Sequence, residues 1–236
     1  MSQPEFVLTH SQPLVVGSFG NLTALSSATP ETLAGECDIA EIRLDLIYDD
    51  YEKHGTSLWQ HLDGFPLLFT ARRHSEGSPV DLPTQTRQTL LKSALQSASL
   101  LDIEVASIPE MRELIADLNT RKMPWIASYH RFDRLPTIQE LAPLAVRARD
   151  AGAKAFKFAA TIHSSQDLDH LARLQTHPFD LPAAGMGMGK LGPVSRLLCA
   201  QHGSVLNYGF IGQNETAPGQ WPAKLLRDAI RASTSI

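Results

Sequence analysis

The sequence predicts an α/β protein, a (β/α)8 TIM barrel in which eight parallel strands are surrounded by helices. Short apolar runs recur along the 236 residues, and stretches with helical periodicity lie between them. Strands that alternate with helices indicate a parallel sheet, and eight strands close a barrel. Because such barrels take roughly 200–250 residues as one domain, we expect a single domain over residues 1–236, with its core in about residues 13–233. An open, doubly wound sheet is the alternative that the strand count leaves.

The expected strands are short apolar runs bounded by residues that favour turns. Runs of about four to eight such residues are typical of strands that are buried in a parallel sheet. In chain order the expected strands cover residues 13–19, 38–45, 66–72, 100–105, 124–130, 155–160, 181–188 and 205–210.

Three segments carry the clearest helical signals. Residues 109–122 begin with a proline and place apolar side chains at helical spacing. Residues 137–152 begin with Thr137 three residues before Glu140, which is the spacing of a capping box, and they end at a glycine. Residues 221–233 form an amphipathic stretch that closes the chain.

The composition excludes several functional classes. A net charge of −4 argues against a broad basic surface for nucleic acid. Cys37 and Cys199 lie far apart and without metal-type spacing, as expected of packing residues in a reducing compartment. The first ten residues lack the basic and apolar regions of a secretory signal, and no apolar run approaches the roughly 18 residues of a membrane span. We therefore expect a soluble, cytoplasmic protein.

Charged side chains share one face of several expected strands. Residues two apart on a strand point the same way, so Glu41 and Arg43 face away from Ile42. We expect the apolar sets to pack against the helices and the charged sets to point into the barrel near the carboxyl ends of the strands, where barrel active sites form. One inward charge is compatible with a structural ion pair, but charges from four or more strands indicate a site.

Lys157 is the residue whose surroundings indicate chemistry. It shares a strand face with Ala155 and Ala159, and no acidic residue lies between Asp150 and Asp167. A lysine in an apolar pocket near other cations has a lowered pKa, so its free amine can attack a ketone and form an imine. His130 ends the preceding strand, about 4.8 Å away, and is the candidate base for the adjacent C–H bond.

Two other patterns carry less weight. Residues 187–192, GMGKLG, match the G-x-G-x-x-G pattern of dinucleotide sites, but they lie too late in the chain to open a Rossmann domain. His163, His170 and His177 are seven residues apart, which predicts a solvated helix face and no metal site.

Together the motifs resemble those of type I 3-dehydroquinate dehydratase, the Schiff-base enzyme of the shikimate and quinate pathways. The resemblance runs from about Leu14 to the C-terminal helix and keeps the family order. The matching segments are EIRLD, FTARRHSEG, LLDIE, ASYHRF, FKFAA, MGMGKLGPVSR and the lid segment APGQ.

This resemblance implies a (β/α)8 barrel, usually a homodimer, that needs no metal or cofactor. It implies a hydro-lyase that removes water from 3-dehydroquinate to give 3-dehydroshikimate. Lys157 would form the imine, His130 would move the proton, and Glu76, with Asp102 as a second candidate, would orient His130. Arg196 would hold the substrate carboxylate. The remaining positions would bind hydroxyls, close the site or form its apolar wall: Glu41, Arg43, Arg72, Thr216, Gln220, Met186 and Met188.

Some positions depart from the family pattern. Gly17 aligns with the serine expected in the first strand, with Ser18 after it, so we leave that strand out of the predicted site. Thr216 replaces a common serine, Ser78 a glycine and Tyr208 a phenylalanine. Two alternative functions stay open: a class I aldolase-type lyase, and a non-catalytic sensor of a quinate-pathway ligand.

Overall fold

The computed structural model describes Leu8 and residues 13–234. Apart from Leu8, the segment that we judged not to be a secretory signal lies outside the described residues. Between residues 13 and 234 no helix is long and apolar enough to cross a membrane.

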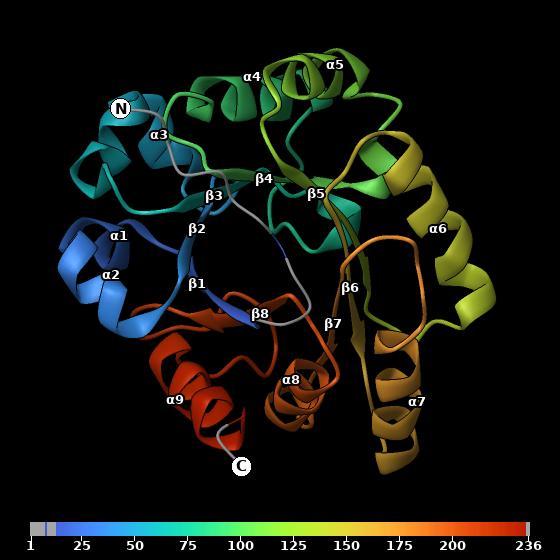
Figure 1. Cartoon of the computed structure of the whole chain (residues 1–236). Helices are drawn as coiled ribbons and strands as arrows, with labels where there is room; N and C mark the ends of the chain where they lie inside the picture. Colours follow the sequence, from blue (N-terminus) through green and yellow to red (C-terminus); the bar gives the residue numbers. More distant parts are fainter. Residues whose placement is uncertain (1–7, 9–12, 235–236) are drawn as a thin grey trace.

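Eight parallel strands form the inner ring of the molecule (Figure 1). The ladder runs in the order β7-β6-β5-β4-β3-β2-β1-β8, and the Val205 N–H donates to the Ala183 carbonyl, 3.1 Å away, across the remaining seam. The barrel predicted from the sequence is confirmed, and the open sheet is wrong. The strands are β1 (Leu14–Phe19), β2 (Ile39–Arg43), β3 (Leu67–Thr70), β4 (Leu100–Glu104), β5 (Trp125–Arg131), β6 (Ala155–Thr161), β7 (Ala183–Met188) and β8 (Leu206–Phe210).

Helices form the outer ring (Figure 1). They are α1 (Leu22–Ser27), α2 (Pro30–Glu36), α3 (Tyr48–His54), α4 (Thr84–Ala94), α5 (Arg112–Arg121), α6 (Ile138–Asp150), α7 (Ser165–Gln175), α8 (Gly192–Gln201) and α9 (Ala223–Thr234). The three predicted helices are present. The one expected from residue 109 begins at Arg112, because residues 108–111 form turns after the 3-10 helix over Val105–Ser107. Glu140 caps α6 by accepting the Thr137 N–H at 2.8 Å.

The expected histidine stripe is wrong in part. Only His170 lies within α7, whereas His163 precedes the helix and His177 follows it. His163 and His170 are exposed, but the His177 ring packs edge-on against Phe179, with 4.8 Å between ring centroids.

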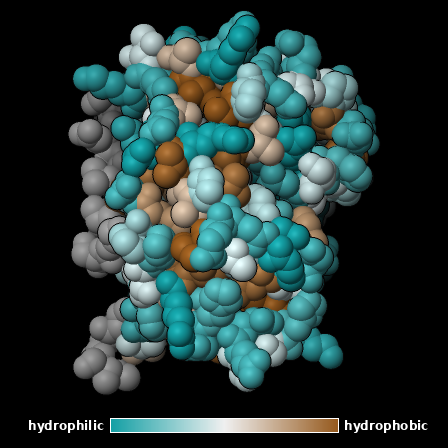
Figure 2. Space-filling view, turned by 90° about the vertical axis from the view of Figure 1, so that its right-hand side faces the viewer, coloured by the Kyte–Doolittle hydropathy of each residue, from teal (hydrophilic) through white to brown (hydrophobic). Residues whose placement is uncertain are grey.

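The two strand faces bury different side chains, as the alternation predicts. Ile42, Phe156 and Phe158 belong to the apolar layer between the strands and the helices. A smaller apolar cluster fills the barrel, with Ile39 and Ala155 among its members. The outer surface on the side of α6 and α7 mixes hydrophilic residues with small apolar patches (Figure 2). The strands that carry charged residues, such as β2 and β6, thus send them into the barrel without interrupting the packing of the helices.

Candidate active site

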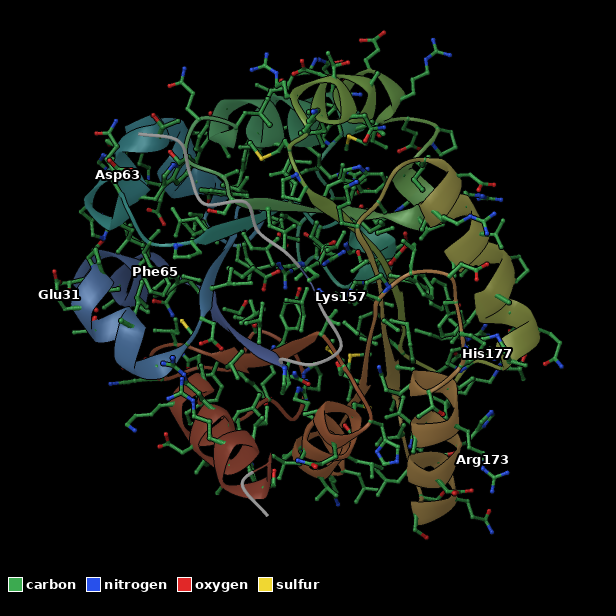
Figure 3. All side chains as sticks on the ribbon, in the orientation of Figure 1. Glu31, Asp63, Phe65, Lys157, Arg173 and His177 are labelled. Carbon is green, nitrogen blue, oxygen red and sulfur yellow. The ribbon has the colours of Figure 1, made fainter. Side chains whose placement is uncertain are left out.

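A cavity opens inside the barrel and reaches the loops that follow the strands. The empty space in and above it is about 570 Å³, including the mouth that is open to solvent. Lys157 lies inside the ring, whereas Glu31, Asp63 and Arg173 lie at its periphery (Figure 3). The predicted site residues that line the cavity are Lys157, His130, Glu76, Glu41, Arg43, Arg72, Arg196, Thr216 and Gln220, with Met186 and Met188. Asp102, the second candidate to orient His130, is not among its lining residues.

Lys157 projects from β6 into the barrel and is only 4% exposed. Its Nζ lies 2.8 Å from Oδ2 of Asp102 on β4. Burial lowers the pKa of the amine, as does the nearby charge of Arg72, and the Asp102 carboxylate opposes this shift. The site therefore favours a neutral amine more than water does, which is what attack on a carbonyl requires.

Asp102 connects the buried charges of the cavity. Besides Lys157, it accepts hydrogen bonds from Arg72 Nη1 and Nη2 at 3.1 and 3.0 Å and from the Ser128 hydroxyl at 2.5 Å. Burial alone would raise the pKa of Asp102, but Arg72 and Lys157 hold it well below its usual range. We had expected Asp102 to help orient His130. Its hydrogen bonds go to these other residues instead, and it acts on His130 through its charge.

His130 and Glu76 form the hydrogen-bonded pair that the sequence predicts. Glu76 comes from the 3-10 turn after β3, and its Oε2 lies 3.0 Å from both the Nδ1 and the backbone N–H of His130. Burial and the cations Arg72 and Lys157 hold the pKa of His130 well below its ordinary value. Burial also raises the pKa of Glu76 to about 7. When Glu76 is ionised it accepts from Nδ1–H, which leaves the lone pair on Nε2 of a neutral imidazole.

Two predicted arginines are held by carboxylates. Arg43 donates from Nε and Nη2 to the two carboxylate oxygens of Asp45, at 3.0 and 2.7 Å. Arg72 uses both Nη atoms on Asp102, and its Nη1 also lies 3.1 Å from Oε1 of Glu104. Bidentate pairs of this kind fix the plane of a guanidinium. Arg72 therefore lines the cavity with most of its donors already engaged.

Glu41 is fixed by two hydroxyls. The Ser18 Oγ donates to Oε2, and the Thr70 Oγ1 donates to Oε1 at 2.7 Å. Ser18 is fully buried and pairs in register with Glu41, whereas Gly17 points outward against Ile211. Ser18, from the strand left out of the predicted site, supports Glu41 from behind, and no β1 residue is among those that line the cavity.

Arg196, at the start of α8, is a buried cation whose described hydrogen bonds go only to backbone carbonyls. Its Nη1 donates to the Gly187 and Gly219 carbonyls, both at 3.1 Å, and its buried Nε has no hydrogen-bond partner between residues 13 and 234. Burial lowers the pKa of Arg196 to about 10. An anion that enters the cavity would satisfy both the charge and the free donor.

The segment from Thr216 to Gln220 folds over the cavity. The Gln220 Oε1 accepts from the Thr216 N–H at 2.9 Å, the Thr216 hydroxyl at 2.8 Å and the Ala217 N–H at 3.1 Å. The Pro218 carbonyl accepts the Gly189 N–H at 3.1 Å. Residues 187–192, GMGKLG, thus contact this lid through the backbone. A Cβ at Gly192 would lie 2.7 Å from the Gly219 carbonyl, so glycine permits the approach.

The chain matches the family described as type I 3-dehydroquinase over residues 18–236. The chain belongs to this family. It is 31% identical to the 3-dehydroquinate dehydratase of Methanothrix thermoacetophila, and the alignment covers 93% of this chain and 91% of that protein.

Two further proteins show the extent of the similarity. The chain is 28% identical to a bifunctional 3-dehydroquinate dehydratase/shikimate dehydrogenase of Arabidopsis thaliana, over 92% of this chain, and spans 36% of that longer protein. The fold is that of the 3-dehydroquinate dehydratase of Geobacillus kaustophilus, with a TM-score of 0.79 at 22% identity and coverage of 98% and 97% of the two chains.

Two aromatic residues of the cavity were missed among the predicted site residues of this type I 3-dehydroquinase. Tyr208 of β8 lines the cavity, and Phe132 lies at its mouth, 46% exposed, with Gly77 beneath its ring. The alternation of Leu206 and Tyr208 along β8 is the signal that identifies Tyr208 as inward-facing. Phe132 follows the end of β5, where no strand periodicity applies.

Proposed function

We propose that this chain is a 3-dehydroquinate dehydratase in which Lys157 forms an imine with the ring ketone and His130 transfers the proton. The observation that carries the proposal is the geometry of the cavity. It places a buried lysine whose pKa is lowered beside a neutral histidine on the neighbouring strand. Family membership and the relatives named above support the substrate.

The reaction follows from these two groups. The free amine adds to the ketone carbon, and loss of water leaves a protonated imine that draws electrons from the adjacent C–H bond. His130 removes that proton through Nε2, while Glu76 holds Nδ1. The enamine then expels the β-hydroxyl, which takes a proton from His130 and leaves as water. Addition of water to the imine releases the enone and restores Lys157, with no external oxidant or cofactor.

The other cavity residues would bind the substrate. Arg196 suits the carboxylate, because its fork geometry matches two oxygens and it forms no direct ion pair within residues 13–234, although the charge of Glu215 acts on it. Hydroxyls of the ring would meet Glu41, Arg43, Thr216 and the free amide nitrogen of Gln220. Arg72 would hold Asp102, and the side chains of Met186 and Met188 would form the apolar wall.

Borohydride trapping and a dehydration assay test this proposal together. Wild-type protein incubated with 3-dehydroquinate and borohydride should carry the adduct on the Lys157 peptide, and turnover should produce a conjugated enone that absorbs in the near ultraviolet. Lys157→Ala should abolish both signals. Lys154→Ala should retain them, because Lys154 is exposed. An adduct on another peptide would reject the mechanism, carbon–carbon cleavage fragments would favour an aldolase, and binding without enone would favour a sensor.

The same proposal includes a homodimer, as the family resemblance implies, and a cytoplasmic location, as the composition predicts. Sedimentation equilibrium of the purified chain would test the dimer. Fractionation of cells that express the protein would test its location.

A further inference from the structure

The ring of Tyr208 forms one side of the space around the reactive amine. Tyr208 is 2% exposed, and Lys157 Nζ lies 4.0 Å from the centroid of its ring. Asp102 contacts the same nitrogen at 2.8 Å. A cation above the face of an aromatic ring is attracted by its electrons, and this attraction is strongest where water is excluded. The nitrogen of Lys157 is thus held by a carboxylate and an aromatic face.

The Tyr208 hydroxyl does not fix this ring position. Its Oη is buried and has no hydrogen-bond partner among the residues that the structure describes. Packing holds the ring instead, because Tyr208 belongs to the apolar cluster inside the barrel together with Val16 and Met186. A phenylalanine at this position would therefore keep the ring over Lys157.

We propose that Tyr208 is a positioning residue for the imine chemistry: its ring face holds the nitrogen of Lys157 beside Asp102, first as the ammonium and then as the protonated imine. This role rests on the proposed function, since the protonated imine forms only if Lys157 adds to the substrate ketone. It adds to the site an aromatic group that the predicted site residues did not include.

The contribution of the ring is separable from that of the charges around the amine. Those charges belong to Asp102 of β4, Arg72 after β3 and Glu41 of β2, and they stay in place when the ring is changed. The other titratable group that acts together with Lys157 is His130 of β5, whose lowered pKa keeps it neutral. Leucine at position 208 would fill part of the space with apolar atoms while removing the aromatic face. The ring stabilises the charged form of Lys157, so its loss should lower the pKa of the amine.

Competitive acetylation measures the amine without any substrate. Wild type, Tyr208→Leu and Tyr208→Phe are exposed to trace labelled acetic anhydride across a pH series. The labelled peptides of Lys157 and of the exposed Lys154 are then quantified. We expect the pH at which Lys157 acetylation is half-maximal to fall by about one unit in Tyr208→Leu. This shift corresponds to roughly a tenfold weaker stabilisation of the Lys157 ammonium. Tyr208→Phe should restore the wild-type midpoint, and Lys154 should not change.

Turnover gives a second measurement. In Tyr208→Leu, kcat should fall by about tenfold. Tyr208→Phe should keep most of the wild-type kcat. Tyr51→Leu is the matched control, because Tyr51 stacks on Trp59 outside the barrel interior, and thermal unfolding reports on folding. An unchanged or raised Lys157 midpoint in Tyr208→Leu would overturn the role, as would an equal shift in Tyr208→Phe. Failure of the proposed function would appear separately, as wild-type protein that traps no 3-dehydroquinate.

Discussion

Asp102→Asn is the most informative test of how the buried charges depend on one another. The Asp102 side chain is fully buried and is the carboxylate between two cations, Arg72 and Lys157. Asparagine keeps the shape but removes the negative charge, and its amide nitrogen would face donors on at least one side. The variant therefore leaves Lys157 without its counterion, while Glu104 still contacts Arg72 at 3.1 Å.

The expected loss of stability follows from these contacts. Removing one partner of a buried ion pair costs about 3–5 kcal/mol. Because Glu104 continues to compensate Arg72, we expect the lower end, about 3 kcal/mol. In a chain of this length each kcal/mol changes Tm by roughly 2–4 °C, so Tm should fall by about 6–12 °C.

The loss of stability in Asp102→Asn should also depend on pH, and its direction follows from the pKa of Lys157. The pKa of Lys157 is already lowered in the folded protein and falls further without Asp102. The unfolded chain then binds the lysine proton more readily than the folded chain does, and this difference costs more stability as the pH falls. The difference in Tm between wild type and Asp102→Asn should be larger at pH 6 than at pH 9.

Thermal unfolding followed by circular dichroism at both pH values measures these effects. Asp228→Asn is the matched control, because it removes a carboxylate from an exposed ion pair with Lys224 in α9. That control should leave Tm nearly unchanged. A fall of less than about 2 °C for Asp102→Asn, or an equal fall at both pH values, would refute the coupling between Asp102 and Lys157.

Three further substitutions test the binding and catalytic groups. Glu76→Gln should lower kcat by roughly ten- to a hundredfold, because a charge-assisted hydrogen bond is lost. In wild type we expect the rate to decline below about pH 7, where Glu76 gains its proton, and the variant should lack this decline. Identical pH–rate profiles of the two proteins would contradict this role. Arg196→Lys should raise KM by roughly tenfold or more, because lysine lacks the planar guanidinium that can bind two carboxylate oxygens. An unchanged KM in initial-rate kinetics would argue against carboxylate binding by Arg196. Gly219→Ala should raise KM by displacing the lid, because Gly219 has a φ of +76° and an added Cβ would lie 2.0 Å from the Gly189 carbonyl oxygen. Gly35→Ala in α2 is the control, because its added Cβ would meet open space, and its KM should match that of wild type.

The barrel was predictable because alternation along the strands is set by local geometry. The inward and outward sets of β2 and β6 follow from residues two apart, and the structure reproduces them. The ends of elements were less predictable. β3 ends at Thr70, two residues earlier than expected, because the Arg72 N–H turns away to donate to Asp45 at 3.1 Å. A contact between residues 27 apart in the chain leaves no local trace in the sequence.

The site was predictable in its residue types but less in its pairings. Lys157 and Asp102 lie 55 residues apart, and only the strand register brings them together. The inward position of Ser18 follows from local geometry. Val15 and Phe19 pack outward, so alternation alone assigns Ser18 to the barrel interior. Alignment to a family position gave Gly17 instead, which shows that strand periodicity was the better guide at that point.

The contact between Arg196 and the lid has a consequence for how this sequence can vary. Both acceptors of its Nη1 are backbone carbonyls, at Gly187 and Gly219. Main-chain oxygens are present whatever side chain a residue carries, so the link between the cation and the lid does not require any particular lid side chain. Exchanges such as threonine for serine at position 216 are therefore compatible with it. At this link the lid is constrained in backbone shape, at Gly219, whereas its internal hydrogen bonds still depend on the Gln220 side chain.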